Sequence, residues 1–168
     1  RVASEIDDLG PGRTCQVHFA RGYLIDGDIV RPDVERIARE LLADPVIEAF
    51  SLNDENTTHH SRLTTHSTAI ANVLLKPGVM DPVAQSVGQA IRQLGLTVNE
   101  VHSFRRYWID GVGENGRKQE IADCVLANDA IEQVTWGPLK LDHLAHGSAY
   151  RLEVIRIPIR TMTDSELL

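Results

Sequence analysis

The spacing of hydrophobic residues along the chain predicts strands and helices in a fixed order. Residues 17–25 alternate as a strand, and Gly22 is expected to form a β-bulge where the alternation slips. The next segment has helical spacing with Pro32 in its first turn, and Val46–Leu52 has strand character again. The apolar positions of that helix are Val34, Ile37, Ala38, Leu41 and Leu42. The pattern predicts a strand, a helix and a closing strand.

The same order recurs in the second half of the chain. Val17–Gly27 reads VHFARGYLIDG and Val101–Gly111 reads VHSFRRYWIDG, an offset of 84 residues (101 − 17) with seven of eleven positions identical. The register continues without a gap through a second helix into an expected closing strand at Ala130–Trp136. The sequence therefore predicts a duplicated domain.

Each middle strand is expected to follow a first helix. Val2, Ile6 and Leu9 have helical spacing, and in the second copy Asp81-Pro82 reads as a helix start. The apolar face expected for this second helix comprises Val83, Val87, Ala90, Ile91 and Leu94. A β-rich run, Ile70–Lys76, precedes it and is expected to be the opening strand of the copy.

The two halves are expected to differ at their outer ends. The equivalent of the opening strand would fall before Arg1, so the first copy is expected to lack that strand. A capping-box pattern at Thr163 predicts the start of a helix, and the sequence ends at Leu168 before that helix is complete. The chain is therefore expected to be a piece of a longer polypeptide.

These elements predict an α+β fold in which each copy is a ferredoxin-like unit, with an antiparallel sheet and helices on one face. The predicted division is a first repeat at 1–52, a polar linker at 53–68, a second repeat at 69–160 and the start of a further linker at 161–168. The second repeat includes an additional β-rich run, Tyr150–Ile159. An isolated unit of this size leaves an apolar face and sheet edges open, so the copies are expected to pack as a pseudo-dimer.

Composition narrows the function classes. The formal net charge is −7, from 17 basic and 24 acidic residues, which argues against a nucleic-acid surface. No apolar run approaches the roughly 20 residues of a membrane span, and the start of the chain lacks a secretion signal. A cytoplasmic location is expected, and Cys15 and Cys124 are expected to be reduced thiols because they stand at different positions in the two copies.

Candidate chemistry is sparse. Gly111–Gly116 matches GxGxxG, but the other copy keeps only the first glycine, Gly27, so a flexible connection is favoured over a phosphate loop. His59, His60 and His66 lie in the polar linker, where solvated side chains are favoured over a metal site.

Histidine, arginine and aromatic residues recur on the two middle strands. Paired structural positions at an interface between the copies are favoured over a binding site, because residues three apart on a strand point to opposite faces. The candidate interface residues are His18, Arg21, Tyr23, His102, Arg105, Arg106 and Tyr107. No catalytic, cofactor-binding or metal-ligating residue is assigned.

Two segments carry a resemblance to a known family. Leu74–Val87, LLKPGVMDPVAQSV, resembles the signature that opens PurS-type domains: an aliphatic strand, Lys-Pro-Gly-Val, Asp-Pro and an amphipathic helix. Leu41–Glu48, LLADPVIE, and Leu126–Glu132, LANDAIE, are similar to the end of the family's second helix. The family commonly has Gly-Lys after the arginine of the middle strand, where this chain has Gly22-Tyr23 and Arg106-Tyr107. Contacts of that pair are therefore not carried over.

The resemblance implies a role in phosphoribosylformylglycinamidine (FGAM) synthase, the ligase that amidates formylglycinamide ribonucleotide in purine biosynthesis. A tandem pair resembles the N-terminal region of the large synthetase subunit, and PurS units help to couple that subunit to its glutaminase. The resemblance implies a non-catalytic assembly domain whose partners are the synthetase domain of its parent chain and the glutaminase. ATP and magnesium are expected in the parent enzyme rather than in this segment.

Two other functions stay open at this point. Paired ferredoxin-like units also serve as small-molecule sensing domains, with a metabolite bound between the copies. A free-standing enzyme would depend on the glycine loop and the paired histidines alone.

Overall fold

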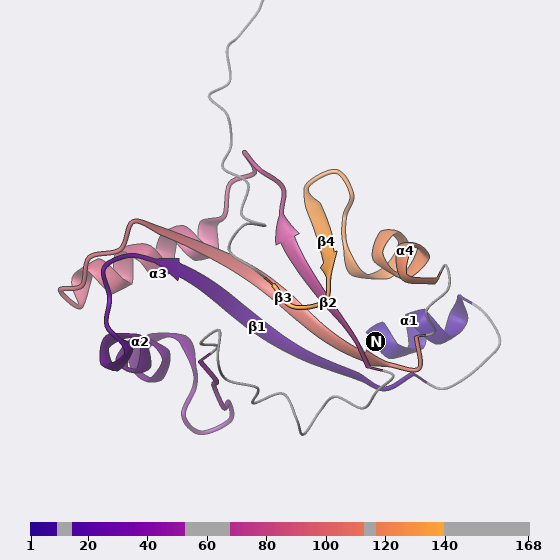
Figure 1. Cartoon of the computed structure of the whole chain (residues 1–168), viewed down its shortest axis with the longest axis horizontal. Coiled ribbons are helices and arrows are strands. Elements are labelled where there is room, and N and C mark those ends of the chain that lie inside the picture. The colour runs from indigo at the N-terminus through magenta and orange to yellow at the C-terminus, as the bar shows by residue number, and fades with distance from the viewer. Residues whose placement is uncertain (10–14, 53–67, 113–116, 140–168) are drawn as a thin grey trace, which may run out of the picture.

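The computed structural model of the chain describes residues 1–9, 15–52, 68–112 and 117–139, and the statements below concern these residues. They form a four-stranded antiparallel sheet in the order β1-β3-β2-β4, with helices packed against it (Figure 1). The strands are β1 (Val17–Asp26), β2 (Thr68–Leu75), β3 (Glu100–Asp110) and β4 (Glu132–Trp136). The expected α+β fold is confirmed.

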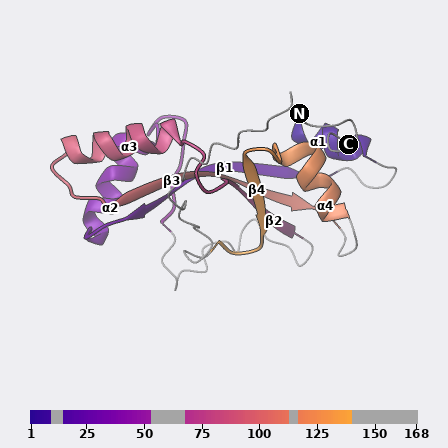
Figure 2. The same ribbon diagram turned by 90° about the horizontal axis from the view of Figure 1, so that it is seen from above.

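Four α-helices accompany the strands in the described residues. They are α1 (Val2–Asp8), α2 (Arg31–Ile37), α3 (Pro82–Gln93) and α4 (Arg117–Ile121). The chain continues from α2 into the π-helical turn η1 (Ala38–Leu42) and from α4 into η2 (Ala122–Leu126). The change from α-helix to π-helix occurs at equivalent positions of the two halves, after Ile37 and after Ile121, so the halves share this irregular backbone conformation as well. Helices α2 and α3 lie at one end of the sheet, and α1 and α4 lie at the other (Figure 2).

Two hydrophobic cores lie on the helix-covered face, and each joins the two halves of the chain. In one core Ile6 of α1 is buried with Ile121 of α4, beside Tyr107 and Ile109 of β3. In the other, Ile37 of α2 is buried with Ile91 of α3. Both cores thus pair the first helix of one half with the second helix of the other.

The strands β1 and β3, which hold the repeated sequence, lie side by side. Their antiparallel pairing is one to one along β1, from Val17 opposite Ile109 to Asp26 opposite Glu100. The expected bulge at Gly22 is therefore wrong. Gly22 lies opposite Phe104, and a Cβ placed on Gly22 would come within 2.1 Å of the Phe104 ring. Gly22 thus leaves space for the Phe104 ring on the neighbouring strand, and no extra residue is inserted into β1.

Of the two expected closing strands, the second forms and the first does not. Strand β4 is confirmed within Ala130–Trp136, and it pairs with β2. Val46–Leu52 contains no strand, and Val46 and Ile47 are 86% and 80% exposed. Among the described residues no equivalent of β2 pairs with β1, so this segment has no neighbouring strand to extend. The expectation failed because strand formation here depends on a non-local partner.

The start of α3 is confirmed, and its expected apolar face is confirmed at Val87 and Ile91, which pack into the second core, but not at Val83. The Asp81 carboxylate accepts the N–H of Ala84 at 2.8 Å, and Pro82 occupies the first turn. Val83, expected on the apolar face, is 52% exposed. The buried residues of α3 are Ala84, Gly88 and Ile91, and a Cβ placed on Gly88 would lie 3.6 Å from the Val101 side chain of β3.

Several expectations concern residues outside the described ranges. They are the linker at 53–67 with its three histidines, the β-rich run at 150–159 and the capping box at Thr163. Cys15 is buried and Cys124 is exposed, and both are free thiols as expected. Within the described part of the chain, no helix has the length and apolar character of a membrane span.

Candidate functional site

All seven candidate interface residues lie on the paired strands β1 and β3, but on two faces of the sheet. Alternation along the strands places four on the face that the helices cover and three on the opposite face. The first group is Arg21, Tyr23, Arg105 and Tyr107, and the second is His18, His102 and Arg106. The structure therefore brings the residues onto one pair of strands without making them a single cluster, and His18 is on the opposite face from Arg21 as the strand period requires.

Arg21 and Arg105, which occupy equivalent positions in the repeat, lie directly opposite each other. Each guanidinium has its own carboxylate: Arg21 Nη2 lies 2.5 Å from Glu48 Oε1, and Arg105 Nη2 lies 2.7 Å from Glu132 Oε1. The two glutamates are also 84 positions apart. These ion pairs neutralise two like charges that adjacent strands would otherwise hold side by side.

Glu48 and Glu132 also close the turn that follows each π-helical segment. Glu48 accepts the N–H of Asp44 at 3.0 Å, and Glu132 accepts the N–H of Asn128 at 2.9 Å. Asp44 and Asn128 in turn accept backbone N–H groups two residues further along, as in an Asx turn. Both copies thus make the same contacts, from the segments LLADPVIE and LANDAIE.

Sequence reasoning did not assign a role to these two glutamates. Their recurrence at the repeat offset, one in each copy, was the signal available for finding them. The positively charged Arg21 guanidinium and the Asp44 N–H both favour the ionised form of Glu48. The Asp44 hydrogen bond is the larger cause, and together they lower the pKa of Glu48 below its ordinary value.

The ion pair in the second half is the less exposed one. The side chains of Arg105 and Glu132 are 40% and 18% exposed, against 55% and 37% for Arg21 and Glu48. Arg105 also donates to the carbonyl oxygen of Leu126 at 3.2 Å. The pair in the second half is therefore held more firmly, because β4 and the end of η2 surround it.

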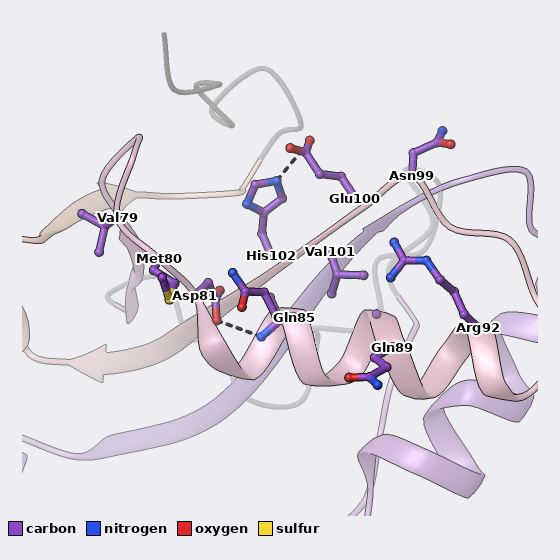
Figure 3. Close-up of a pocket in the computed structure, with 12 residues that line it drawn as sticks. Val79, Met80, Asp81, Gln85, Gln89, Arg92, Asn99, Glu100, Val101 and His102 are labelled. Atoms are coloured by element: carbon purple, nitrogen blue, oxygen red, sulfur yellow. Dashed lines mark hydrogen bonds and ion pairs between the residues drawn. The ribbon is translucent and has the colours of Figure 1, made fainter. Parts of the chain in front are cut away.

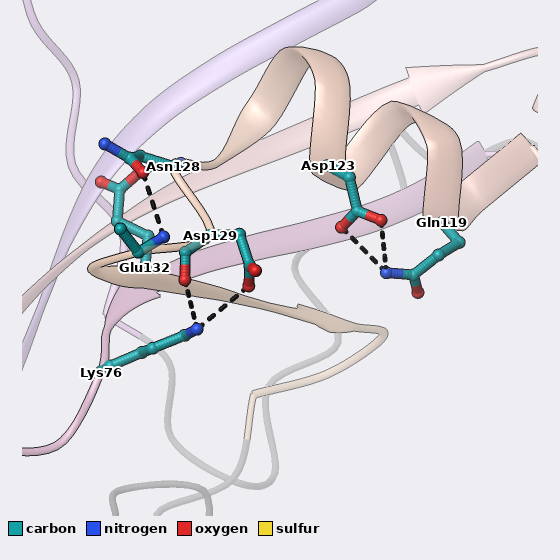
Figure 4. Close-up of polar contacts among 7 residues, drawn as sticks. Lys76, Gln119, Asp123, Asn128, Asp129 and Glu132 are labelled. Carbon is teal, nitrogen blue, oxygen red and sulfur yellow. Dashed lines mark hydrogen bonds and ion pairs between the residues drawn. The ribbon is translucent and has the colours of Figure 1, made fainter. Parts of the chain in front are cut away.

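Two charged residues of the Leu74–Val87 segment contact other elements of the second half. Lys76 Nζ lies 3.0 Å from Asp129 Oδ1 and also donates to the Asp129 carbonyl oxygen, beside the turn that Asn128 and Glu132 close (Figure 4). Asp81, besides capping α3, accepts the Ser103 N–H and hydroxyl, both at 2.9 Å. These contacts join the ends of β2 and α3 to β4 and β3.

On the face away from the helices, Arg106 is buried beside aromatic rings. Its Nε donates to Asn72 Oδ1 at 2.6 Å, and its guanidinium carbon lies 5.1 Å from the centre of the Phe104 ring. Among the described residues no carboxylate pairs with it, and burial alone lowers its pKa. Asn72 is fully buried and donates to the carbonyl oxygens of Thr135 and Gly137, so it links β3 to β4 across β2.

The two histidines do not form a site together. His18 is exposed on β1 opposite Trp108, whereas His102 lies opposite Leu24 with its Nε2 3.4 Å from Glu100 Oε2. In the described part of the chain, no group of three or more histidine, cysteine, aspartate or glutamate side chains has the arrangement of a metal site. The register thus separates His18 from His102.

A hollow of about 520 Å³ lies between α3 and the first residues of β3 (Figure 3). Its polar lining is largely engaged within the protein. Asp81 makes the contacts described above, Arg92 donates to the Val98 carbonyl oxygen, Asn99 donates to Asp26, and His102 lies against Glu100. The side chains of Gln85 and Gln89 also line this hollow.

The glycine motif after β3 is described only in part. Gly111 has a φ of +84°, a left-handed conformation that glycine adopts without strain, and Val112 packs into the first core. Residues 113–116 lie outside the described ranges, and the phosphate-loop alternative depends on them.

Comparison with known proteins relates the second half of the chain to one family. No curated protein and no solved structure matches the chain. Residues 68–137, which contain β2, α3, β3, α4, η2 and β4, match the family model described as "PurS: Phosphoribosylformylglycinamidine (FGAM) synthase". Residues 68–137, 70 of the 168 residues of the chain, are therefore similar to the PurS domain of FGAM synthase.

Proposed function

We propose that this chain is a non-catalytic assembly domain of FGAM synthase, built from two PurS-like units packed as a pseudo-dimer. Its role is to help couple the synthetase domain of its parent chain to the glutaminase subunit. ATP and Mg²⁺ act in the synthetase domain, where formylglycinamide ribonucleotide is amidated.

The observation that carries this proposal is the repetition of one set of contacts about the β1–β3 pairing. The second half matches the PurS family model, and the first half repeats its arginine, its glutamate and its turn. Equivalent residues of the two halves are 84 positions apart. His18 is therefore equivalent to His102 and Leu24 to Trp108, and the strand pairing joins His18 to Trp108 and Leu24 to His102. Arg21 lies opposite its own equivalent, Arg105. This register is what a two-fold axis between two homologous units requires.

The two cores support the same arrangement. Ile6 and Ile91 are equivalent first-helix residues, and Ile37 and Ile121 are equivalent second-helix residues. Each first helix packs with the second helix of the other unit, so neither unit encloses its own core. An interface of this kind favours a fixed relative orientation, which suits a domain that positions two larger proteins.

The proposal is tested in the parent enzyme by comparing glutamine with free ammonia as the nitrogen source. A Leu24→Pro change removes an N–H that points toward β3 and should open the β1–β3 pairing, whereas Leu24→Ala keeps that N–H. We expect Leu24→Pro to lose co-purification with the glutaminase and glutamine-dependent FGAM formation, and to retain ammonia-dependent formation.

Leu24→Ala should retain both activities. Equal loss with glutamine and ammonia would place the domain in synthetase chemistry instead. Undiminished co-purification by Leu24→Pro, with β1 shown to be displaced by amide hydrogen exchange, would contradict the assembly role.

A further inference from the structure

Strand β1 has a neighbour on one side only among the described residues. Asp110 donates its N–H to the carbonyl oxygen of Gln16 at 2.9 Å, and partners in an antiparallel ladder exchange hydrogen bonds at alternate positions. The even-numbered residues of β1 therefore direct their N–H groups to β3. Along the stretch of β1 equivalent to the part of β3 that pairs with β2, the amides pointing away from β3 are those of Arg21, Tyr23 and Ile25.

The equivalent edge of β3 is occupied. Strand β2 pairs with β3 from Thr68 opposite Asp110 to Leu74 opposite Phe104, and β4 then pairs with the far side of β2. In the first half the counterpart of β4 is Val46–Leu52, which is not a strand. Among the described residues, the halves thus differ at one strand position and at the segment that would lie beyond it.

The surroundings of that position already have the conformation found in the second half. The turn at Asp44 and the Arg21–Glu48 ion pair match those at Asn128 and Arg105–Glu132. The apolar side chains beyond the turn are exposed, with Val46 at 86%, Ile47 at 80% and Phe50 at 42%. Phe19 on β1 is 54% exposed as well.

We propose that the outer edge of β1 is an acceptor site for one antiparallel strand with the sequence pattern of β2. Equivalence to the β2–β3 register places the counterpart of Ala71 opposite Tyr23 and the counterpart of Thr68 opposite Asp26. The bound strand supplies the edge on which Glu48–Leu52 becomes a further strand, as β2 does for β4. The occupant is thus an extended, largely apolar peptide segment, recognised through its backbone.

A capped synthetic peptide with the sequence of Thr68–Lys76, TAIANVLLK, is the probe. We expect saturable one-to-one binding to the chain, measured by fluorescence anisotropy of a labelled peptide. Amide hydrogen exchange should slow at Arg21, Tyr23 and Ile25, and also within Glu48–Leu52. A peptide with proline in place of Val73 should not bind, because Val73 lies opposite Arg105 in the ladder that the peptide copies.

A matched pair of protein variants separates backbone recognition from side-chain contact. Tyr23→Pro removes the central outward N–H, and Tyr23→Ala keeps it, so Tyr23→Pro should bind the peptide roughly tenfold more weakly than Tyr23→Ala. Unchanged far-ultraviolet circular dichroism in both variants checks the fold. Absence of binding, equal binding by the proline peptide, or protection of the same three amides by self-association without peptide would overturn the proposal.

Discussion

Arg21 lies directly opposite Arg105 at the point where the β1–β3 pairing coincides with the sequence repeat. Each arginine reaches a glutamate 27 residues further along the chain, Glu48 for Arg21 and Glu132 for Arg105. The repeat thus conserves an interaction between the middle strand and the turn after the second helix. Two like charges can face each other here because each is neutralised within its own half.

The two ion pairs are expected to differ in their importance for stability. Arg105→Met should lower the free energy of unfolding by about 1–2 kcal/mol, because it leaves the largely covered Glu132 carboxylate without its cation. Arg21→Met should have a smaller effect, since both members of that pair are more exposed. Urea denaturation followed by circular dichroism measures both. An equal effect of the two substitutions would show that burial does not distinguish the pairs.

The Gly22–Phe104 contact predicts a size restriction on β1. Gly22→Ala should destabilise the fold by about 1–3 kcal/mol, because its Cβ would lie 2.1 Å from the Phe104 ring. Gly88→Ala on α3 is the control: its Cβ would meet its nearest neighbours at 3.5 Å, and alanine favours the helix. Thermal denaturation should show a lower Tm for Gly22→Ala and an unchanged or higher Tm for Gly88→Ala.

A second substitution identifies the cause of the Gly22→Ala effect. Adding Phe104→Ala removes the ring that the new methyl group would meet. The double variant should therefore be less destabilised than the sum of the two single changes. Simple additivity would mean that Gly22 is required for another reason.

Much of the fold follows from local sequence, and the failures share a physical origin. The Asp81 cap, α1 and the middle strands depend on residues close together in the chain, so spacing alone predicted them. Val46–Leu52 has strand-like composition but lacks a neighbouring strand, and Gly22 avoids a bulge because Phe104 lies across from it. Pairing partners of this kind are not visible in a local pattern.

The candidate site was predictable to the same extent. Recurrence at the repeat offset found Arg21 and Arg105, but their carboxylate partners depend on how the turn after η1 or η2 folds back onto the sheet. Asn72 was missed for a similar reason. Asn72 lies in an apolar strand, and its hydrogen-bond partners, Arg106 and the carbonyl oxygens of Thr135 and Gly137, are distant from it in the sequence.

The buried Arg106–Asn72 contact predicts an unequal response to removing either partner. Asn72→Ala should cost about 1–3 kcal/mol of stability, because Arg106 and the carbonyl oxygens of Thr135 and Gly137 lose a partner in a buried setting. Arg106→Met should cost less, since it also removes a desolvated charge that no described carboxylate balances. Chemical denaturation of both variants gives the comparison. A larger loss for Arg106→Met would contradict this account.

Acid should weaken the contacts of Glu48. Its pKa is lowered in the fold, so its contribution to stability is present above the pKa of the unfolded chain and is lost as the pH falls through the lower, folded pKa. Glu48→Gln should therefore make the loss of stability below about pH 5 less steep. The check is the urea midpoint between pH 7 and pH 3, with Glu40→Gln on the exposed surface as the control. A parallel shift at every pH would mean that ionisation of Glu48 is not involved.

The two thiols are expected to react at very different rates. Cys124 is exposed, whereas Cys15 is buried, and burial, with Asp7 as the next cause, raises the pKa of the Cys15 thiol. Fewer Cys15 side chains are then ionised at neutral pH, and reagent reaches them less readily. Reaction with 5,5′-dithiobis(2-nitrobenzoic acid) at pH 8 should release one equivalent of thiolate rapidly and a second one slowly, and Cys124→Ser should abolish the rapid phase alone. Two rapid equivalents from the folded chain would show that α1 does not cover Cys15.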